Sequence, residues 1–341
     1  IYPAGKPETR YAVPDGVGAV DTYAFYYNKG LQAIDLNDVT RVGEYAFYNA
    51  KGLEEADLGG AVAAIDSYAF NGCGNLKLLL HSQALQRIGD SAFSNCALQY
   101  VLLPAVTDIG SYAFSYNRGM TRAVIGENIR SIAASAFNYC SAMTEAYFLG
   151  GQPESIGANI FNKTAAGFTI YYPESRTDVW APIGETKWGA YPIAPTTFYT
   201  VTFLDVDHSV LLEQPVAQGQ AAIVPQQPSR PEAPFTGWSA DSSNVTENMV
   251  IIALYEGLKD IVTVTAQAGE HGVISPAGIS EYPYDSTAAY TFTPDEGYHV
   301  EQVIVNGENL GQLDGYTFRN LRADSTIEVR FAINTYTVTY V

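Results

Sequence analysis

The nonapeptides IGDSAFSNC (88–96) and IAASAFNYC (132–140) are two copies of the motif that decides the fold of this chain. Their Ala-Phe dipeptide recurs through the first half of the sequence, with the phenylalanine at Phe25, Phe47, Phe70, Phe93, Phe114, Phe137 and, in a degenerate copy, Phe161. The intervals between these phenylalanines are 22, 23, 23, 21, 23 and 24 residues. A period in the low twenties is far too long for a heptad and predicts one supersecondary unit repeated into a solenoid.

Five units also carry an apolar triplet after the phenylalanine, at positions x, x+3 and x+5. Leu98-Val101-Leu103 and Met143-Ala146-Phe148 are examples. Positions x+3 and x+5 have the same parity, so in an extended segment both side chains point to one face. A single unit cannot bury a phenylalanine and three aliphatic side chains, whereas a stack of units buries all of them. We therefore expect one short strand per unit, a glycine-containing turn, and an Ala-Phe segment on the far side.

The three cysteines, Cys73, Cys96 and Cys140, all lie three residues after a repeat phenylalanine. Asn28 and Asn117 occupy the same position in other units. Alternation of Cys and Asn is typical of a buried turn in which a small polar side chain bonds the backbone of the adjacent coil. Their odd number and their match to the repeat favour structural cysteines over a disulfide, a metal site or a reactive thiol.

These strings, together with VLLPAVTDIGSYAF (101–114), resemble the BspA-like leucine-rich repeats of bacterial surface proteins. The resemblance implies a mainly β fold: a leucine-rich-repeat solenoid with a short parallel strand per repeat and an irregular or short helical convex side. WAPIGETKWGAYPIAP (180–195) resembles the Trp-containing segment that closes such arrays. Residues 1–195 are therefore predicted to form the solenoid with its C-terminal cap.

Beyond Pro195 the pattern changes to short alternating strands separated by Pro- and Gly-containing turns. Residues 198–257, with YTVTFLD, FTGW and a final ALY, resemble the internalin B-repeat, also called the Listeria-Bacteroides repeat. Residues 260–333 resemble a divergent module of the same type, and residues 334–341 are expected to start a further, truncated module. The resemblance implies two small β-rich, β-grasp-like modules that act as spacers.

Acidic residues outnumber basic ones by 36 to 18 and the net charge is −18, which argues against nucleic acid or an anionic membrane as a partner. The sequence has no apolar run near the roughly 20 residues that a membrane span needs. No signal peptide is visible, because Ile1 begins directly in polar sequence. With the resemblance, this predicts an extracellular protein of the bacterial cell surface whose leader and anchor are not present in this fragment.

The residues that usually carry catalysis do not converge in the sequence. The four histidines are scattered without paired spacing, and neither a phosphate-binding Gly-rich loop nor a Gly-x-Ser-x-Gly elbow occurs. LDVDHS (204–209) has two aspartates at i and i+2 but lacks the other ligands and the central glycine of a calcium loop, so it is interpreted as a turn. We expect no enzyme activity, no cofactor and no metal site.

Residues that flank position x+3 are predicted to face outward, onto the concave strand face of the solenoid. Along the middle and the end of this face the predicted side chains are apolar or aromatic: Leu78, Leu80, Tyr100, Leu102, Val124, Tyr147, Ile170 and Tyr172. A contiguous exposed apolar patch usually marks a partner site. The alternative is that the C-terminal modules, or a sister chain, fold against it.

Near the start of the same face, Asp35, Glu55 and Asp57 are predicted to form an acidic cluster, because neighbouring strands lie about 4.7–4.9 Å apart. Such a cluster either attracts a cation or is simply solvated. The many tyrosines of the Ala-Phe segments are interpreted mainly as packed, semi-exposed side chains, with stacking on sugars as the alternative.

The sequence thus predicts a non-catalytic surface protein that binds a protein partner from a host, a matrix or a neighbouring cell through the concave face. The alternative is a carbohydrate-binding or scaffold component of a surface glycan-uptake system, with a glycan as the partner. The sequence leaves the identity of the ligand and the oligomeric state open.

Overall fold

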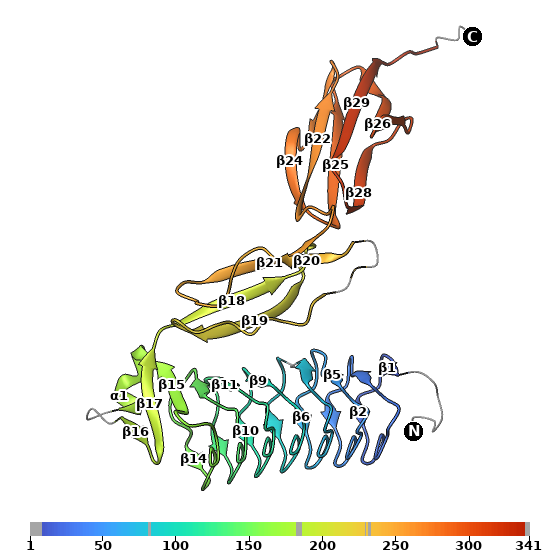
Figure 1. The fold of residues 1–341 in the computed structure, drawn as a ribbon. Coiled ribbons are helices and arrows are strands. Elements are labelled where there is room, and N and C mark those ends of the chain that lie inside the picture. Colours follow the sequence, from blue (N-terminus) through green and yellow to red (C-terminus); the bar gives the residue numbers. More distant parts are fainter. Residues whose placement is uncertain (1–8, 81–82, 182–185, 229, 231–232, 338–341) are drawn as a thin grey trace. The chain divides into compact units, whose positions relative to one another are not determined.

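A computed structural model describes residues 9–80, 83–181, 186–228, 230 and 233–337 of the chain. The chain divides into two compact units, Ile1–Phe198 and Tyr199–Val341. The first is a β solenoid and the second contains two further groups of strands (Figure 1). The predicted mainly β solenoid followed by β-rich modules is therefore confirmed. Within the described residues no helix is long and apolar enough to cross a membrane.

One side of the solenoid carries the strands predicted from the apolar triplets. They are β1 (Arg10–Ala12), β3 (Ala33–Asp35), β5 (Glu55–Asp57), β7 (Leu78–Leu80), β9 (Tyr100–Leu103), β11 (Arg122–Ile125), β13 (Glu145–Phe148) and β15 (Thr169–Pro173). Strands β1 to β7 form one parallel sheet, and β9 to β15 form a second one that continues into the cap. Neighbouring strands pair in the register of the repeat, as Ala123 does with Ala146.

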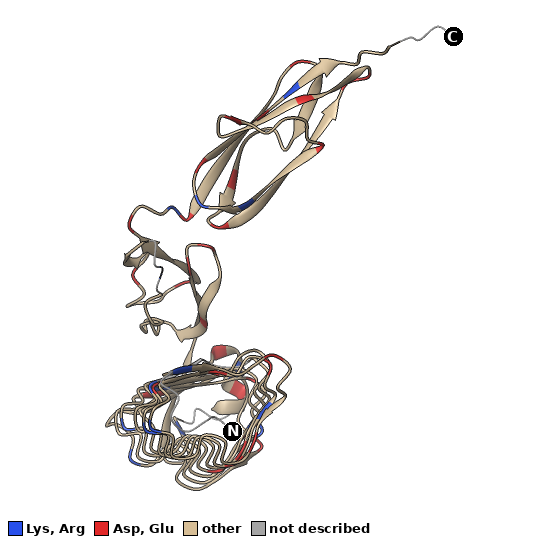
Figure 2. Ribbon diagram, turned by 90° about the vertical axis from the view of Figure 1, so that its right-hand side faces the viewer, with Lys and Arg blue, Asp and Glu red and all other residues tan. Residues whose placement is uncertain are grey.

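The other side carries a narrow parallel sheet of seven two-residue strands, where an irregular or helical side was expected. These strands are β2 (Ala19–Val20), β4 (Arg41–Val42), β6 (Ala64–Ile65), β8 (Arg87–Ile88), β10 (Asp108–Ile109), β12 (Ser131–Ile132) and β14 (Ser155–Ile156). In most of them the second residue is a buried Val or Ile and the first points away from the core. Figure 2 looks along the stack, so that successive coils of the solenoid superpose.

The repeat phenylalanines stack into one continuous column inside the solenoid. From Phe25 to Phe161 the ring centroids of successive members lie 4.7–5.4 Å apart, and the rings are close to parallel. Each buried phenylalanine contributes about 1.5–3 kcal/mol by leaving water. Offset stacking of neighbouring rings adds about 0.5–1.5 kcal/mol per pair, so each coil is stabilised by the coils beside it.

The residue two positions before each phenylalanine has a left-handed backbone. This position is occupied by Tyr23, Tyr45, Tyr68, Ser91, Tyr112, Ser135 and Asn159, with φ between 53° and 61°. A left-handed backbone costs roughly 1–2 kcal/mol for a residue with a Cβ atom. In return, the amide of Tyr45 donates to the carbonyl of Ser67, and that of Phe47 donates to Ala69 (2.7 Å), in the next coil. These hydrogen bonds between coils hold the tyrosines at fixed positions.

The solenoid ends in a cap built from η1 (Glu174–Arg176), α1 (Thr177–Trp180), β16 (Lys187–Trp188) and β17 (Tyr191–Thr196). Trp180 is fully buried, stacks on Tyr172 at 5.4 Å and donates from Nε1 to the carbonyl of Gly150 at 3.0 Å. Trp188 packs edge-on against Trp180 and Phe148. The two tryptophans therefore cover the last hydrophobic coil.

The second unit begins with a four-stranded sheet in the order β19-β18-β21-β20. Its strands are β18 (Phe198–Leu204), β19 (Val210–Ala217), β20 (Phe235–Trp238) and β21 (Met249–Tyr255). Strands β18 and β21 run parallel, and β20 is antiparallel to β21.

The remaining strands form two sheets, in the orders β24-β22-β29-β26-β27 and β23-β25-β28. They are β22 (Ile261–Ala268), β23 (Gly272–Ser275), β24 (Gly278–Pro283), β25 (Ser286–Pro294), β26 (Tyr298–Val305), β27 (Glu308–Asn309), β28 (Gly315–Leu321) and β29 (Ser325–Ile333). One hydrophobic cluster joins Val206 and Tyr255 of the first group to Val262 and Tyr284 of the second. The two groups of strands therefore share a core within the second unit.

Candidate functional site

The predicted concave face lies on β9, β11 and β13, and its residues alternate as expected there. Val101, Ala123 and Ala146 belong to the solenoid core, whereas Leu102, Val124 and Tyr147 lie outside that core cluster. These three are nevertheless buried, and Tyr100 is half-buried. Leu78 and Leu80 belong to β7, but their side chains lie outside the described part of the structure. The use of this face as a partner site stays a prediction.

The outward orientation predicted for Ile170 and Tyr172 is wrong. In β15 Ile170 is the register partner of Ala146, and both Ile170 and Tyr172 belong to the solenoid core. Tyr171 takes the outward position instead and contacts Tyr147 edge-on at 5.9 Å. In the last coil Gly167 occupies position x, where the other coils have Leu or Met. An interval of nine residues from the repeat phenylalanine to the inward residue, as from Phe137 to Ala146, would have given the correct register.

Tyr147 is held in a polar cluster that the sequence analysis did not anticipate. The Arg122 guanidinium donates to Glu145 Oε1 from Nε at 2.8 Å and from Nη2 at 2.6 Å, and Tyr147 Oη donates to Glu145 Oε2 at 2.8 Å. Arg122 also lies over the Tyr147 ring, at 4.8 Å from its centroid, and Phe198 packs edge-on against the same ring. Burial raises the pKa of the Tyr147 phenol, so it stays protonated. This part of the face is a fixed structural cluster.

The structure brings Asp35, Glu55 and Asp57 close together on β3 and β5, with Asp35 and Asp57 as register partners. Each has a local partner. Asp35 accepts the amide of Asn37 at 3.0 Å, Asp57 accepts that of Gly59 at 2.9 Å, and Glu55 pairs with Arg10 at 2.6 Å. No group of three or more His, Cys, Asp or Glu side chains among the described residues is arranged to hold a metal ion.

The structure places all three cysteine thiols inside the stack, each against the preceding coil. Cys73 Sγ donates to the carbonyl of Phe47 (3.0 Å), Cys96 to that of Phe70 (3.2 Å) and Cys140 to that of Phe114 (3.3 Å). Asn117, at the same repeat position, donates to the carbonyls of Phe93 and Phe114, both at 2.8 Å. Burial raises the pKa of the Cys140 thiol to about 12, which disfavours the thiolate that a nucleophile requires.

A tyrosine array, exposed in part, lies on the Ala-Phe segments of the first three coils. It consists of Tyr23, Tyr26, Tyr27, Tyr45, Tyr48 and Tyr68. Tyr23, Tyr45 and Tyr68 stack with centroids 5.3 and 5.0 Å apart, and Tyr26 stacks on Tyr48 at 5.4 Å. Tyr23, Tyr26 and Tyr27 are 55%, 45% and 50% exposed. The sequence analysis placed tyrosines at these repeat positions but could not rank their exposure.

A smaller group continues the pattern farther along the solenoid. Tyr116 stacks on Tyr139 at 4.8 Å, and the Arg118 guanidinium lies 5.8 Å from the Tyr116 ring centroid. Ser91 and Asn95 replace tyrosines in the coil between the two groups.

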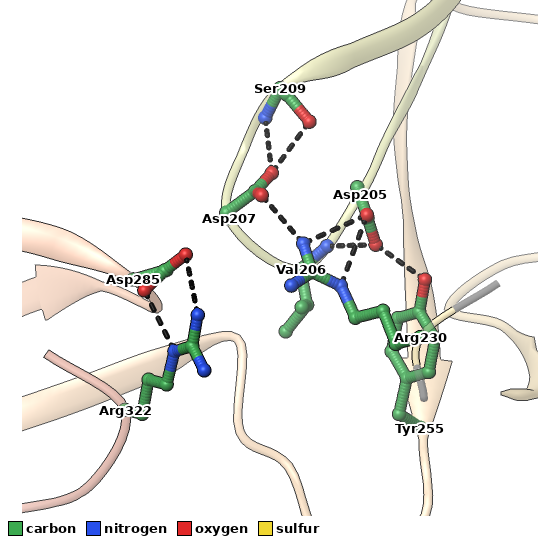
Figure 3. Close-up of polar contacts among 8 residues, drawn as sticks. All are labelled: Asp205, Val206, Asp207, Ser209, Arg230, Tyr255, Asp285 and Arg322. Atoms are coloured by element: carbon green, nitrogen blue, oxygen red, sulfur yellow. Dashed lines mark hydrogen bonds and ion pairs between the residues drawn. The ribbon is translucent and has the colours of Figure 1, made fainter. Parts of the chain in front are cut away.

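In the second unit, the two aspartates of LDVDHS lie on a tight turn and bind an arginine (Figure 3). His208 has a left-handed backbone (φ 65°) and donates its amide to the carbonyl of Asp205 at 2.9 Å. Arg230 pairs with Asp205 at 2.9 Å and with Asp207 at 2.5 Å, and Tyr255 Oη donates to Asp205 at 2.6 Å. Because these carboxylates already have cationic and hydroxyl partners, the segment is a structural turn.

The solenoid sequence matches the family model described as "BspA type Leucine rich repeat region (6 copies)" over residues 8–121 and 64–180, which together span just over half of the chain. No curated protein matches the chain.

Several solved structures are similar to the chain. A leucine-rich repeat protein of T. pallidum has 26% identity and a TM-score of 0.44, covering 55% of this chain and 88% of that one. A leucine-rich repeat protein of Bacteroides ovatus has 19% identity and a TM-score of 0.41, covering 58% and 64%. A leucine-rich cell surface protein of Faecalibacterium prausnitzii has 24% identity and a TM-score of 0.42, covering 49% and 48%.

The motif, the coil that it folds into and the extent of the family match agree with one another. The chain belongs to the BspA-type leucine-rich repeat family.

Proposed function

We propose that this chain is a non-catalytic bacterial surface protein that binds a protein partner, and that the tyrosine array is its contact surface. The observation that carries the proposal is the array itself: six tyrosines in mutual ring contact, three of them about half exposed, on a rigid stack. Tyrosine is enriched at protein interfaces because it offers a large amphipathic contact area. It has few rotatable bonds, so little conformational entropy is lost on binding.

Rigidity adds to this argument. Tyr23, Tyr45 and Tyr68 have a left-handed backbone, and hydrogen bonds join their coils. Together these fix the backbone position from which each tyrosine side chain extends. Stacking on the neighbouring rings then fixes its orientation. A partner that binds such a surface meets side chains that are already ordered, which lowers the cost of binding.

The same stacking argues against the array as a platform for sugars. A sugar ring packs on the face of an aromatic ring. In the array, stacking at 5.0–5.4 Å covers both faces of Tyr45 and one face of each of the other stacked rings. Ring edges and phenol hydroxyls remain on the surface, and they suit the backbone and side chains of a protein.

Surface plasmon resonance of the full chain against immobilised extracellular-matrix proteins and bacterial surface proteins tests the proposal. The double variant Tyr26→Ser/Tyr48→Ser should weaken binding to any captured partner at least tenfold, since tyrosine is enriched among the hot-spot residues whose truncation costs about 2 kcal/mol or more. Tyr116→Ser/Tyr139→Ser, which removes another exposed stacked pair, is the matched control and should leave the affinity unchanged. Equal affinities of both variants and the parent chain would contradict the assignment.

We further propose the domain division predicted from the sequence, in which residues 198–257 and 260–333 are spacer modules of the internalin B-repeat type. The two groups of strands fall within these bounds, and their shared core supports a stiff second unit. We also propose that the protein is exported to the bacterial cell surface, because families of this type are typically found there. Labelling of intact cells with an antibody against the solenoid tests this location.

A further inference from the structure

We infer that the outer side of the two-residue sheet carries a second binding site, a groove that takes a neutral, hydroxyl-rich chain such as an oligosaccharide. The groove has a volume of about 570 Å³ and is lined by residues from Thr22 in the first coil to Ser131 in the sixth. Coils are spaced about 4.8 Å apart, so five spacings give it a length of about 24 Å. Its volume lies within the range of roughly 300–1,000 Å³ that is typical of ligand sites.

The depth of the groove has a backbone cause. Gly89 and Gly110 line it, and a Cβ atom at these positions would lie 2.5 and 2.6 Å from backbone atoms of the preceding coil. At these two glycines, adjacent coils therefore pack backbone against backbone, with no side chain between them. The first residues of the short strands and the residues beside the glycines form its walls.

Charged residues of both signs line the walls, including Glu44 beside Arg41 in the second coil. Arg41 is in the second coil, Asp66 in the third, Arg87 and Asp90 in the fourth and Asp108 in the fifth. Arg41 pairs with Asp66, and Arg87 approaches the same carboxylate at 3.9 Å. The two arginine side chains remain 62% and 65% exposed, so much of each guanidinium faces solvent. Figure 2 shows basic and acidic residues around the outside of the coils.

The acidic groups are held in place by neighbouring coils. Asp108 accepts hydrogen bonds from Ser131 Oγ at 2.6 Å and Thr107 Oγ1 at 2.7 Å, and these bonds keep the pKa of its carboxyl below the ordinary value. Asp90 accepts the amide of Ser111 at 2.7 Å. Each carboxylate has further lone pairs for a ligand, and its orientation is fixed before binding.

This pattern selects against ligands of a single charge. A polyanion meets Glu44, Asp66, Asp90 and Asp108, and a polycation meets Arg41 and Arg87. Like charges brought together across an interface are costly. A neutral chain of hydroxyl groups avoids both penalties, because each hydroxyl donates to a carboxylate or accepts from a guanidinium. Hydrogen bonds to charged groups are also stronger than those between neutral groups. The geometry therefore favours an uncharged oligosaccharide lying along the stack.

Isothermal titration calorimetry of the full chain tests this assignment. The probes are linear hexasaccharides: neutral fragments of β-glucan, xylan and mannan, an anionic galacturonic acid hexamer and a cationic glucosamine hexamer. At least one neutral hexamer should bind, and the charged hexamers should bind at least tenfold more weakly. Strongest binding by a charged hexamer, or binding by none of the five, would overturn the proposal.

Variants of the groove locate the site. Arg87→Ala and Arg41→Ala should each weaken binding of the neutral hexamer at least tenfold. Circular dichroism melting of Arg87→Ala, which leaves Arg41 paired with Asp66, should remain that of the parent chain. Arg41→Ala removes the closer partner of the mostly buried Asp66 carboxylate and should melt at a lower temperature. Tyr26→Ser/Tyr48→Ser, which alters the tyrosine array, should leave hexamer binding unchanged. The two proposed binding surfaces are thus tested independently of each other. Undiminished hexamer binding in both arginine variants would refute the site.

Discussion

Replacing Arg230 by alanine tests how the second unit is held together. The guanidinium contacts Asp205 from Nε at 3.1 Å and from Nη2 at 2.9 Å, and it contacts Asp207 at 2.5 Å. It also lies 5.7 Å from the ring centroid of Tyr255 and 5.5 Å from that of Tyr284 (Figure 3 shows the polar contacts). Because Tyr255 ends β21 and Tyr284 follows β24, Arg230 bridges the two groups of strands.

The expected loss of unfolding free energy follows from how deeply the charge cluster is buried. Removing one member of a fully buried charge cluster costs about 3–5 kcal/mol, because its partners stay buried and uncompensated. The side chains of Arg230, Asp205 and Asp207 are 12%, 12% and 27% exposed, so solvent screens the remaining carboxylates in part. We therefore expect Arg230→Ala to lower the free energy of unfolding of the second unit by about 2–3 kcal/mol.

Hydrogen–deuterium exchange of the full chain, read by mass spectrometry, measures this change. A loss of about 2–3 kcal/mol raises the exchange rate of amides that open by unfolding of the unit roughly 30- to 150-fold, at tenfold per 1.4 kcal/mol. The effect should reach both β21 and β25. Arg322→Ala is the control, because Arg322 pairs with Asp285 but is 52% exposed, and such pairs contribute about 0–1 kcal/mol. Exchange rates in Arg230→Ala within threefold of those in Arg322→Ala would refute the reasoning.

Three further predictions concern stability. Gly110→Ala should lower the melting temperature clearly, since its Cβ atom would lie 2.6 Å from backbone, whereas Gly119→Ala, with open space around it, should not. Asn117→Ala should cost about 2–4 kcal/mol in denaturant titration by removing three buried hydrogen bonds, and Cys140→Ala, which removes one, about 1 kcal/mol. Burial alone would raise the pKa of Asp207, but hydrogen bonds from Ser209 and the ion pair with Arg230 bring it below its ordinary value. Its stabilising effect should thus be present at neutral pH and be lost in acid, which melting curves between pH 7 and pH 3 would show.

The sequence predicted those parts of the fold that repeat. The Ala-Phe interval located every coil, and the parity of the apolar triplet separated inward Val101 from outward Leu102. Both predictions succeed because each coil contacts mainly its neighbours, so local spacing determines contact. The rule failed in the last coil, where Ile170 and Tyr172 proved to be core residues, because Phe168-Thr-Ile-Tyr-Tyr172 lacks the leucine that sets the register.

The parts that do not repeat could not be predicted in this way. Arg230 lies 25 residues from Asp205 and follows a proline-rich stretch without periodicity, so only the tertiary fold brings the two together. The groove was missed for a related reason. Its walls come in part from the first residues of two-residue strands, such as Arg41, Arg87 and Asp108, which form no recognisable motif.

A stacked solenoid places the residues of each repeat position about 4.8 Å apart, and this spacing treats side chains differently. Aromatic rings gain from it, as in the phenylalanine column and the tyrosine array. Like charges repel one another at this spacing. Asp35 and Asp57 are such neighbours, and each carboxylate accepts a backbone amide of the following turn. The acidic pair is therefore explained by its own turns. The exposed guanidinium atoms of Arg41 and Arg87 and the ring edges of the exposed tyrosines still offer contact surface for a partner. For that reason the two binding surfaces are proposed at these groups.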